Sequence, residues 1–146
     1  MIEIVIITHG LFGEELYLSA EMILGKQGDV HCIAVQPGCA LAEIVDILDG
    51  IITKKSDNGK GVLILTDMFG GSPSNIAFSY SGQPNIEIIS GVNLPMLIKA
   101  FSGRMAGTTL HTLALECGEA AKNSIKIAGE LLDKNRYPKS KNPNKQ

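Results

Sequence analysis

The chain of 146 residues contains no tryptophan and no apolar run near the roughly 20 residues that cross a bilayer. Aliphatic stretches such as Ile4 to Ile7 and Val62 to Leu65 are far shorter. The chain also begins without the cationic segment that precedes the apolar part of a signal peptide. The lack of a long apolar run and of a cationic leading segment predicts a cytoplasmic protein with no direct membrane insertion.

Cysteine is scarce, and its spacing argues against two kinds of site. Cys32, Cys39 and Cys117 are odd in number, form no C-x-x-C pair and have no histidine at a metal-ligand spacing. We therefore expect reduced thiols rather than disulfides, and no metal centre.

Basic residues are scarce in most of the chain. Residues 1–133 hold eight Lys and Arg against 15 Asp and Glu, a net charge of −7, while five further basic residues lie in 134–146 without an acid. An acidic surface does not attract phosphate backbones, which argues against nucleic acid as a partner. Length and a 45% apolar content fit one domain over 1–133, and the basic segment 134–146 is predicted to be a disordered tail.

Four short β-rich runs alternate with segments of helical apolar spacing. The runs are Ile2–Ile7, Val30–Val35, Gly61–Leu65 and Ile86–Ile89. Their nearly continuous aliphatic character is typical of parallel strands covered on both faces. The pattern predicts an α/β, doubly wound, mainly parallel sheet with helices on both faces, and short right-handed connections favour the strand order 2-1-3-4.

Apolar spacing predicts the helices between these strands. The first would turn a set of large side chains to the core: Leu11, Leu16, Leu18, Met22 and Ile23. The second would do the same with Leu41, Ile44, Ile47, Leu48 and Ile51.

Beyond the fourth strand, Asn93 and Pro95 predict the start of a short helix, and the apolar residues from Leu110 to Cys117 predict another that ends before Gly118. Residues 123–128 stay ambiguous. Alternation of apolar and polar side chains there fits an edge strand, whereas the neighbouring Ala and Leu also fit a helix.

Polar residues gather where the first and third strands end, at His9 and Asp67. Open parallel sheets bind ligands outside the carboxyl ends of the strands, where connections part to opposite faces. If these two strands are adjacent, Asp67 can accept a hydrogen bond from Nδ1 of His9 and leave Nε2 as an outward-facing nucleophile. His9 and Asp67 are therefore the candidate catalytic residues.

A glycine-rich loop follows Asp67. Gly70 and Gly71 precede Ser72, a favourable N-cap, and Pro73, a favourable first helical residue. The loop presents backbone N–H groups, and with the Ser72 hydroxyl it forms a candidate phosphate-binding site. The other residues expected to line the site are Thr8, Gly10, Thr66, Met68, Phe69, Gly91 and Asn93.

Simpler explanations exist for each of these features. Met68 and Phe69 can mark a docking patch or can simply pack under the loop. His31, Cys32 and His111 lie in a strand run or on a helix and are interpreted as structural.

A hydrolase triad of Ser72, His9 and Asp67 is the competing chemistry. It is disfavoured because Ser72 precedes a proline rather than standing in a G-x-S-x-G turn.

Three segments carry a more specific signal: Ile-Val-Ile-Ile-Thr-His-Gly at 4–10, Gly-Val-Leu-Ile-Leu-Thr-Asp-Met-Phe-Gly-Gly-Ser-Pro-Ser-Asn at 61–75, and Ile-Ile-Ser-Gly-Val-Asn-Leu-Pro-Met-Leu at 88–97. In this order they resemble the mannose-family IIA component of the bacterial phosphoenolpyruvate-dependent sugar phosphotransferase system. The resemblance covers about the first 130 residues.

The resemblance implies that His9 accepts a phosphoryl group on Nε2 from the phosphocarrier HPr and passes it to a IIB component for sugar uptake. Asp67 would hold Nδ1, Gly70 to Ser72 would cradle the phosphoryl group, and no cofactor is implied. The IIB component is expected to be a separate protein. An alternative is a stand-alone regulatory module whose partner responds to the phosphorylation state of His9.

Members of this family form dimers that exchange a C-terminal edge strand. By this resemblance, the segment from Ser124 to Ala128 is the candidate for a swapped antiparallel strand, and we expect a homodimer. Exchange would also cover a sheet edge that is otherwise open.

Overall fold

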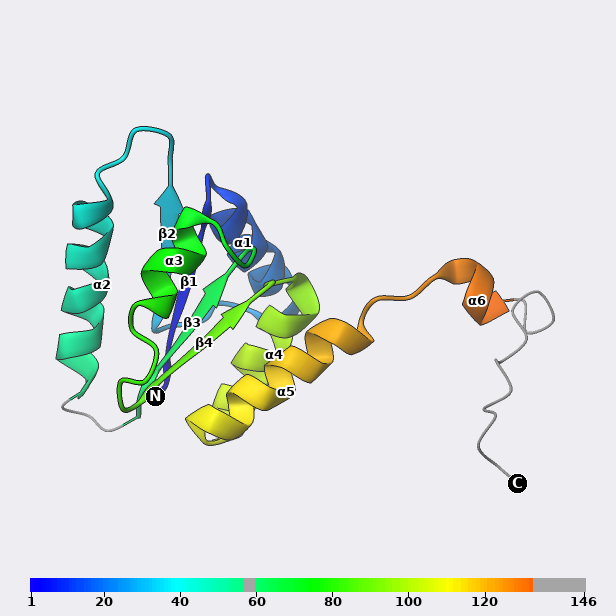
Figure 1. Ribbon diagram of the computed structural model, residues 1–146. Coiled ribbons are helices and arrows are strands. Elements are labelled where there is room, and N and C mark those ends of the chain that lie inside the picture. Colours follow the sequence, from blue (N-terminus) through cyan, green and yellow to red (C-terminus); the bar gives the residue numbers. More distant parts are fainter. Residues whose placement is uncertain (57–59, 133–146) are drawn as a thin grey trace, which may run out of the picture.

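Four parallel strands form the centre of the molecule (Figure 1), within the residues that the computed structural model describes, 1–56 and 60–132. The strands are β1 (Glu3–His9), β2 (Val30–Val35), β3 (Val62–Thr66) and β4 (Ile86–Ser90). Their order is β2-β1-β3-β4, and each neighbouring pair is parallel. The predicted α/β class and strand order are confirmed. β1 continues past its predicted end and includes His9.

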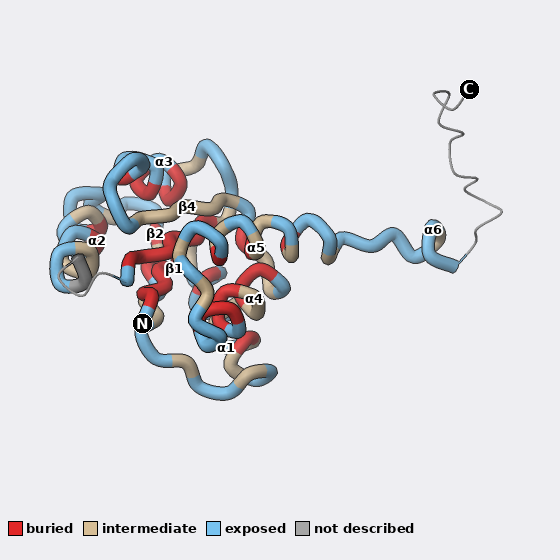
Figure 2. The backbone as a smooth tube through the Cα atoms, turned by 90° about the horizontal axis from the view of Figure 1, so that it is seen from below, coloured by how far each residue is buried: buried red, intermediate tan, exposed pale blue. Residues whose placement is uncertain are grey.

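Helices cover both faces of this sheet (Figures 1 and 2). They are α1 (Phe12–Leu24), α2 (Leu41–Ser56), α3 (Ser72–Phe78), α4 (Leu94–Met105), α5 (Leu110–Asn123) and α6 (Ala128–Leu132). In β1, Ile4 and Ile6 pack with α1, α4 and α5, whereas Val5 and Ile7 pack with α2 and α3. All four side chains are fully buried, because successive residues of a strand point to opposite faces and both faces are covered.

The face that α1 turns to the core differs from the predicted one. The positions that pack against the core are Gly13, Leu16, Tyr17, Ala20 and Leu24. Four of the predicted side chains are exposed instead: Leu11, Leu18, Met22 and Ile23. The reason is the close approach at Gly13, where a Cβ would lie 2.8 Å from Cγ2 of Ile6. This contact sets the rotation of the helix, and Ala20 continues the same face.

The face of α2 follows its prediction in part. Ile44 and Leu48 are buried, and Ile51 packs against the same core. Leu41 and Ile47 are about half exposed, because they flank the buried stripe rather than lie on it.

The C-terminal part departs from two expectations. α4 starts where predicted but is 12 residues long rather than short, and α5 continues through Gly118 to Asn123. Residues 125–127 are neither strand nor helix in this chain. They lead away from the sheet to α6 (Figure 1), and Ile125 and Ile127 are exposed. A strand formed there with a second subunit stays a prediction.

The predicted tail, 134–146, lies outside the described residues. Among the residues that the structure describes, no helix is long and apolar enough to cross a membrane.

Buried charges lie at the amino-terminal edge of the sheet. Arg104, only 5% exposed, donates hydrogen bonds from Nη1 to the carbonyl oxygens of Ile2 (3.2 Å) and Asp29 (3.1 Å). Burial lowers the pKa of Arg104, and the nearby charges of Asp29 and Glu3 oppose that change. Glu3 is 1% exposed, and its Oε2 lies 2.8 Å from Nε2 of His31. These groups tie the starts of β1 and β2 to the end of α4.

Candidate active site

His9 and Asp67 meet at the carboxyl edge of the sheet, where β1 and β3 are neighbours. Nδ1 of His9 lies 2.7 Å from Oδ2 of Asp67, and the backbone N–H of His9 donates to the same oxygen at 2.9 Å. One carboxylate oxygen therefore fixes both the strand end and the imidazole. With Nδ1 as the donor, Nε2 carries the free electron pair.

The carboxylate of Asp67 is held in its charged form. Burial alone would raise its pKa, but hydrogen bonds from the backbone N–H and ring of His9 and from the backbone N–H of Met68 lower it on balance. The N–H of Met68 donates to Oδ1 at 2.9 Å, so both carboxylate oxygens are occupied. The Asp67 side chain is 14% exposed, whereas that of His9 is 51% exposed. A fixed anion thus stands behind an accessible imidazole.

The glycine loop lies against the free edge of this imidazole. A Cβ on Gly71 would come within 2.7 Å of Cε1 and 3.2 Å of Nε2 of His9, so only glycine leaves the ring its place. Gly70 has φ +92°, a conformation that favours glycine. The N-cap of α3 is Gly71 rather than Ser72, which is the first helical residue and makes no capping hydrogen bond.

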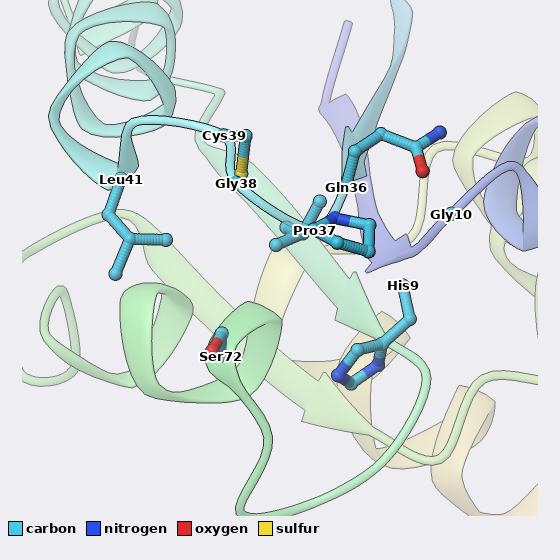
Figure 3. Close-up of a pocket in the computed structure, with 9 residues that line it drawn as sticks. His9, Gly10, Gln36, Pro37, Gly38, Cys39, Leu41 and Ser72 are labelled. Atoms are coloured by element: carbon cyan, nitrogen blue, oxygen red, sulfur yellow. The ribbon is translucent and has the colours of Figure 1, made fainter.

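A cavity of about 600 Å³ opens beside His9 (Figure 3). Its walls are His9, Gly10, Ser72 and a segment that the sequence analysis missed, from Val35 to Leu41. In Figure 3 this β2–α2 loop, with Pro37 and Cys39, faces the histidine and the start of α3. The signal for it was available, because the order 2-1-3-4 places the end of β2 directly beside the end of β1.

The remaining predicted lining residues fall into three groups. Thr8 and Thr66 are completely buried and lie beneath the site rather than in the cavity. Met68 and Phe69 are exposed on the loop that follows Asp67, and the ring of Phe69 meets that of Phe78 edge to face at 5.5 Å.

Gly91 and Asn93 line a separate hollow of about 240 Å³. The side chain of Asn93 accepts the N–H of Met96 at 3.0 Å, and its Nδ2 donates to the carbonyl of Ala121 and the hydroxyl of Ser124, both at 3.3 Å. The structure therefore places Asn93 at the junction of α4 and α5, outside the cavity of His9.

Two alternatives can be compared with this geometry. No hydrogen bond joins Ser72 to His9 in the described part of the chain, so a hydrolase triad lacks its contact between nucleophile and base. The three cysteines are free thiols in this structure. Desolvation raises the pKa of Cys32 and Cys117 to about 11, which favours the protonated form of both thiols at neutral pH.

Fold and site together define a doubly wound α/β protein with a carboxylate-oriented histidine at the switch point of its sheet. Residues 3–116 match the family described as "PTS system fructose IIA component", EIIA-man, and the chain belongs to this family of the sugar phosphotransferase system. The predicted family is confirmed.

Individual relatives agree. The chain is 37% identical over 129 residues to the PTS system mannose-specific EIIAB component of Escherichia coli (strain K12), with 86% of this chain and 40% of that protein aligned. It thus spans two fifths of that relative. It is also 28% identical to the PTS system fructose-specific EIIA component of Bacillus subtilis (strain 168), covering 92% of this chain and 91% of that protein.

Solved structures show the same fold. The PTS IIA protein associated with the fucose utilization operon from Streptococcus pneumoniae superposes with a TM-score of 0.78 at 26% identity, covering 90% of this chain and 96% of that one. EIIA from Streptococcus agalactiae gives 0.77 at 28% identity, over 87% and 97% of the two chains. The family supports a phosphotransferase role in sugar transport for this chain.

Proposed function

We propose that this chain is a phosphocarrier whose His9 accepts a phosphoryl group on Nε2 from phosphorylated HPr and passes it to a IIB component for sugar uptake. The observation that carries the proposal is the double hydrogen bond to Oδ2 of Asp67, from the N–H of His9 at 2.9 Å and from Nδ1 at 2.7 Å. It commits Nδ1 to the carboxylate and leaves Nε2, on the side of the glycine loop, without a hydrogen-bond partner in the described residues.

The transfer proceeds by attack of the Nε2 electron pair on the phosphorus of the donor phosphohistidine. The new N–P bond forms as the donor's N–P bond breaks, and the released electron pair returns to the donor imidazole. The proton on Nδ1 stays between His9 and Asp67, whose negative charge stabilises the cationic ring of the phosphohistidine. Transfer to IIB runs the same exchange with His9 as the donor.

Gly70, Gly71 and Ser72 are the proposed phosphate cradle. Gly71 already lies against the Nε2 edge of the imidazole, so a phosphoryl group on Nε2 would meet the backbone of this loop. Backbone N–H groups and the Ser72 hydroxyl supply neutral donors to its oxygens. Catalysis of this kind depends mainly on positioning and electrostatics.

The partners are proposed to dock on apolar side chains around His9. Five such side chains are at least one-third exposed: Leu11 and Phe12 at the start of α1, Met68 and Phe69 on the loop after β3, and Phe78 at the end of α3. Aromatic and methionine side chains are enriched at protein interfaces. HPr and IIB would use this surface in turn, because each must bring its own reacting atom to the same Nε2.

A homodimer with exchanged C-terminal segments is part of the proposal. The chain beyond α5 projects from the body and exposes four apolar side chains: Ile125, Ile127, Leu131 and Leu132. β4 is an edge of the sheet with no neighbour beyond it in the described residues. When two copies exchange the segment beyond α5, its backbone can pair with the open edge at β4, and its apolar side chains can be buried against the other copy.

The test is phosphate incorporation from phosphoenolpyruvate with purified enzyme I and HPr, followed by intact mass. Wild-type protein should gain one acid-labile, base-stable phosphate, and His9→Ala should gain none while keeping its fold. Asp67→Ala should be phosphorylated more slowly than the wild type and should remain a dimer. No labelling of folded wild-type protein would contradict the proposal, and an unchanged rate in Asp67→Ala would remove this residue from the mechanism.

A further inference from the structure

The first turn of α1 is capped from outside the helix. The residue at its N-cap position, Leu11, has a side chain that cannot accept a hydrogen bond, and none caps the helix there. The N–H of Gly13 instead donates to Oγ1 of Thr8, a residue of β1, at 2.8 Å. Thr8 is completely buried, so no water replaces this acceptor.

The contact is close as well as polar. A Cβ on Gly13 would lie 3.0 Å from Oγ1 of Thr8 and 2.8 Å from Cγ2 of Ile6. The backbone of α1 therefore rests directly on the end of β1, and glycine is the residue that permits it. The hydroxyl of Thr8 also donates to the carbonyl oxygen of Gly10 at 3.5 Å.

His9 lies in the short turn between Thr8 at the end of β1 and Gly13 in the first turn of α1. Successive side chains of a strand point to opposite faces, so Thr8 faces α1 while His9 faces the glycine loop. Gly10 has φ +55°, and its N–H donates to the carbonyl of Val35 at 3.0 Å. The turn is thus fixed to α1 by Thr8, to β2 by Gly10 and to β3 by His9 itself.

We propose that the Thr8 hydroxyl is a positioning group for His9. By capping α1, this hydroxyl holds the His9–Gly10 turn in place, so that the N–H and Nδ1 of His9 both reach Oδ2 of Asp67. The proposal rests on the proposed phosphocarrier function for its kinetic consequence. Its structural consequence, a single orientation and tautomer of the His9 imidazole, does not depend on that function.

The experiment compares Thr8→Val, which keeps the shape and loses the hydroxyl, with Thr8→Ser, which keeps the hydroxyl. Ser19→Ala is the matched control, because it removes a hydroxyl hydrogen bond from α1, to the carbonyl of Glu15, away from the turn. Each protein is assayed below its unfolding temperature for the single-turnover rate constant of phosphoryl transfer from phosphorylated HPr at saturating donor, and for the HPr concentration that gives half of this rate. The ¹⁵N shifts of the His9 imidazole are recorded without phosphate donor.

Thr8→Val should lower the saturating rate constant of transfer about tenfold with the half-saturating HPr concentration unchanged, a part of the roughly hundredfold that a misplacement of one ångström costs. Its imidazole shifts should move from the Nδ1–H tautomer toward a mixture. Thr8→Ser and Ser19→Ala should match the wild type in both measurements. Wild-type imidazole shifts in folded Thr8→Val would overturn the proposal, as would an equal loss of the transfer rate constant in Ser19→Ala. Absence of phosphorylation in the wild type would overturn the proposed function alone.

Discussion

The two edges of the sheet hold similar polar groups and use them differently. At the carboxyl edge, Nδ1 of His9 lies 2.7 Å from Asp67, and the imidazole is half exposed beside a cavity. At the amino edge, Nε2 of His31 lies 2.8 Å from Glu3, which is buried near Arg104. Nη1 of Arg104 holds two backbone carbonyls, whereas Nε2 of His9 at the carboxyl edge has no hydrogen-bond partner among the described residues. The polar groups of the amino edge tie elements of the fold together, and those of the carboxyl edge leave one ring nitrogen beside a cavity.

A third pair shows that the hydrogen-bond distance alone does not mark a site. Nδ1 of His111 lies 2.7 Å from Oε1 of Glu87, the same distance and the same ring nitrogen as in the pair of His9 and Asp67. The His111 side chain is 74% exposed. Only at His9 does the carboxylate also accept the backbone N–H of the histidine, and only there does a glycine loop face Nε2 in the described residues. The surroundings of the pair decide its chemistry.

The largest expected effect is a difference in phosphate incorporation among alanine variants of the three histidines. His9→Ala should lose phosphate incorporation completely, because the accepting nitrogen is gone. His31→Ala and His111→Ala should be labelled at the wild-type rate, since both lie away from the cavity of His9. Intact mass after incubation with phosphoenolpyruvate, enzyme I and HPr measures all three. Labelling that survives in His9→Ala and disappears in either other variant would reverse the assignment of the two edges.

The amino edge should respond in stability instead. Arg104→Ala should lower the free energy of unfolding by about 3 kcal/mol, because it removes buried hydrogen bonds and leaves the charges around them uncompensated. Urea unfolding measures this change. Lys99→Ala, which removes an exposed ion pair with Glu116, is the control and should change stability by less than about 1 kcal/mol. Equal unfolding midpoints for the two variants would show that the buried cation does not stabilise the edge.

A smaller effect tests the contact between His9 and the glycine loop. Gly71→Ala should slow phosphorylation about tenfold, because the added Cβ would lie 2.7 Å from Cε1 of the imidazole and must displace either ring or loop. Gly118→Ala, in α5 with no atom near the added Cβ, is the matched control and should be labelled normally. The initial labelling rate decides between them. A wild-type rate in Gly71→Ala would mean that phosphorylation does not depend on the present position of the His9 imidazole against the loop.

Much of the candidate site could be predicted from the sequence, because a few general rules of parallel α/β sheets determine where such a site lies. Alternating strands and helices give a parallel sheet, ligands bind at its carboxyl edge, and His9 and Asp67 are polar residues at adjacent strand ends. The β2–α2 loop was missed because Val35 is followed by residues without obvious chemistry, Gln36 and Pro37. Their place in the cavity follows from strand order rather than from residue type.

Close packing explains the larger errors. Counting large apolar residues put Leu18 and Met22 on the buried face of α1, whereas the core takes Gly13 and Ala20, whose small size lets the backbone approach β1. Such a contact has no periodic apolar signature. The segment from Ile125 to Ile127 could not be assigned either, because a strand that needs a second copy has no partner within one chain.

The smallest expected effect is the pH dependence of the Asp67 contribution to stability. Hydrogen bonds from His9 and Met68 outweigh burial and lower the pKa of Asp67 in the folded chain, whereas the unfolded value is near 3.9. The stabilisation by the charged carboxylate is therefore fully present above the unfolded value and is lost as pH falls through the folded one. The difference in unfolding free energy between wild type and Asp67→Asn, measured by urea unfolding from pH 7 to pH 3, should be constant near neutrality and shrink in the acid range. A difference that does not change over this range would mean that the hydrogen bonds to Asp67 do not favour its ionised form.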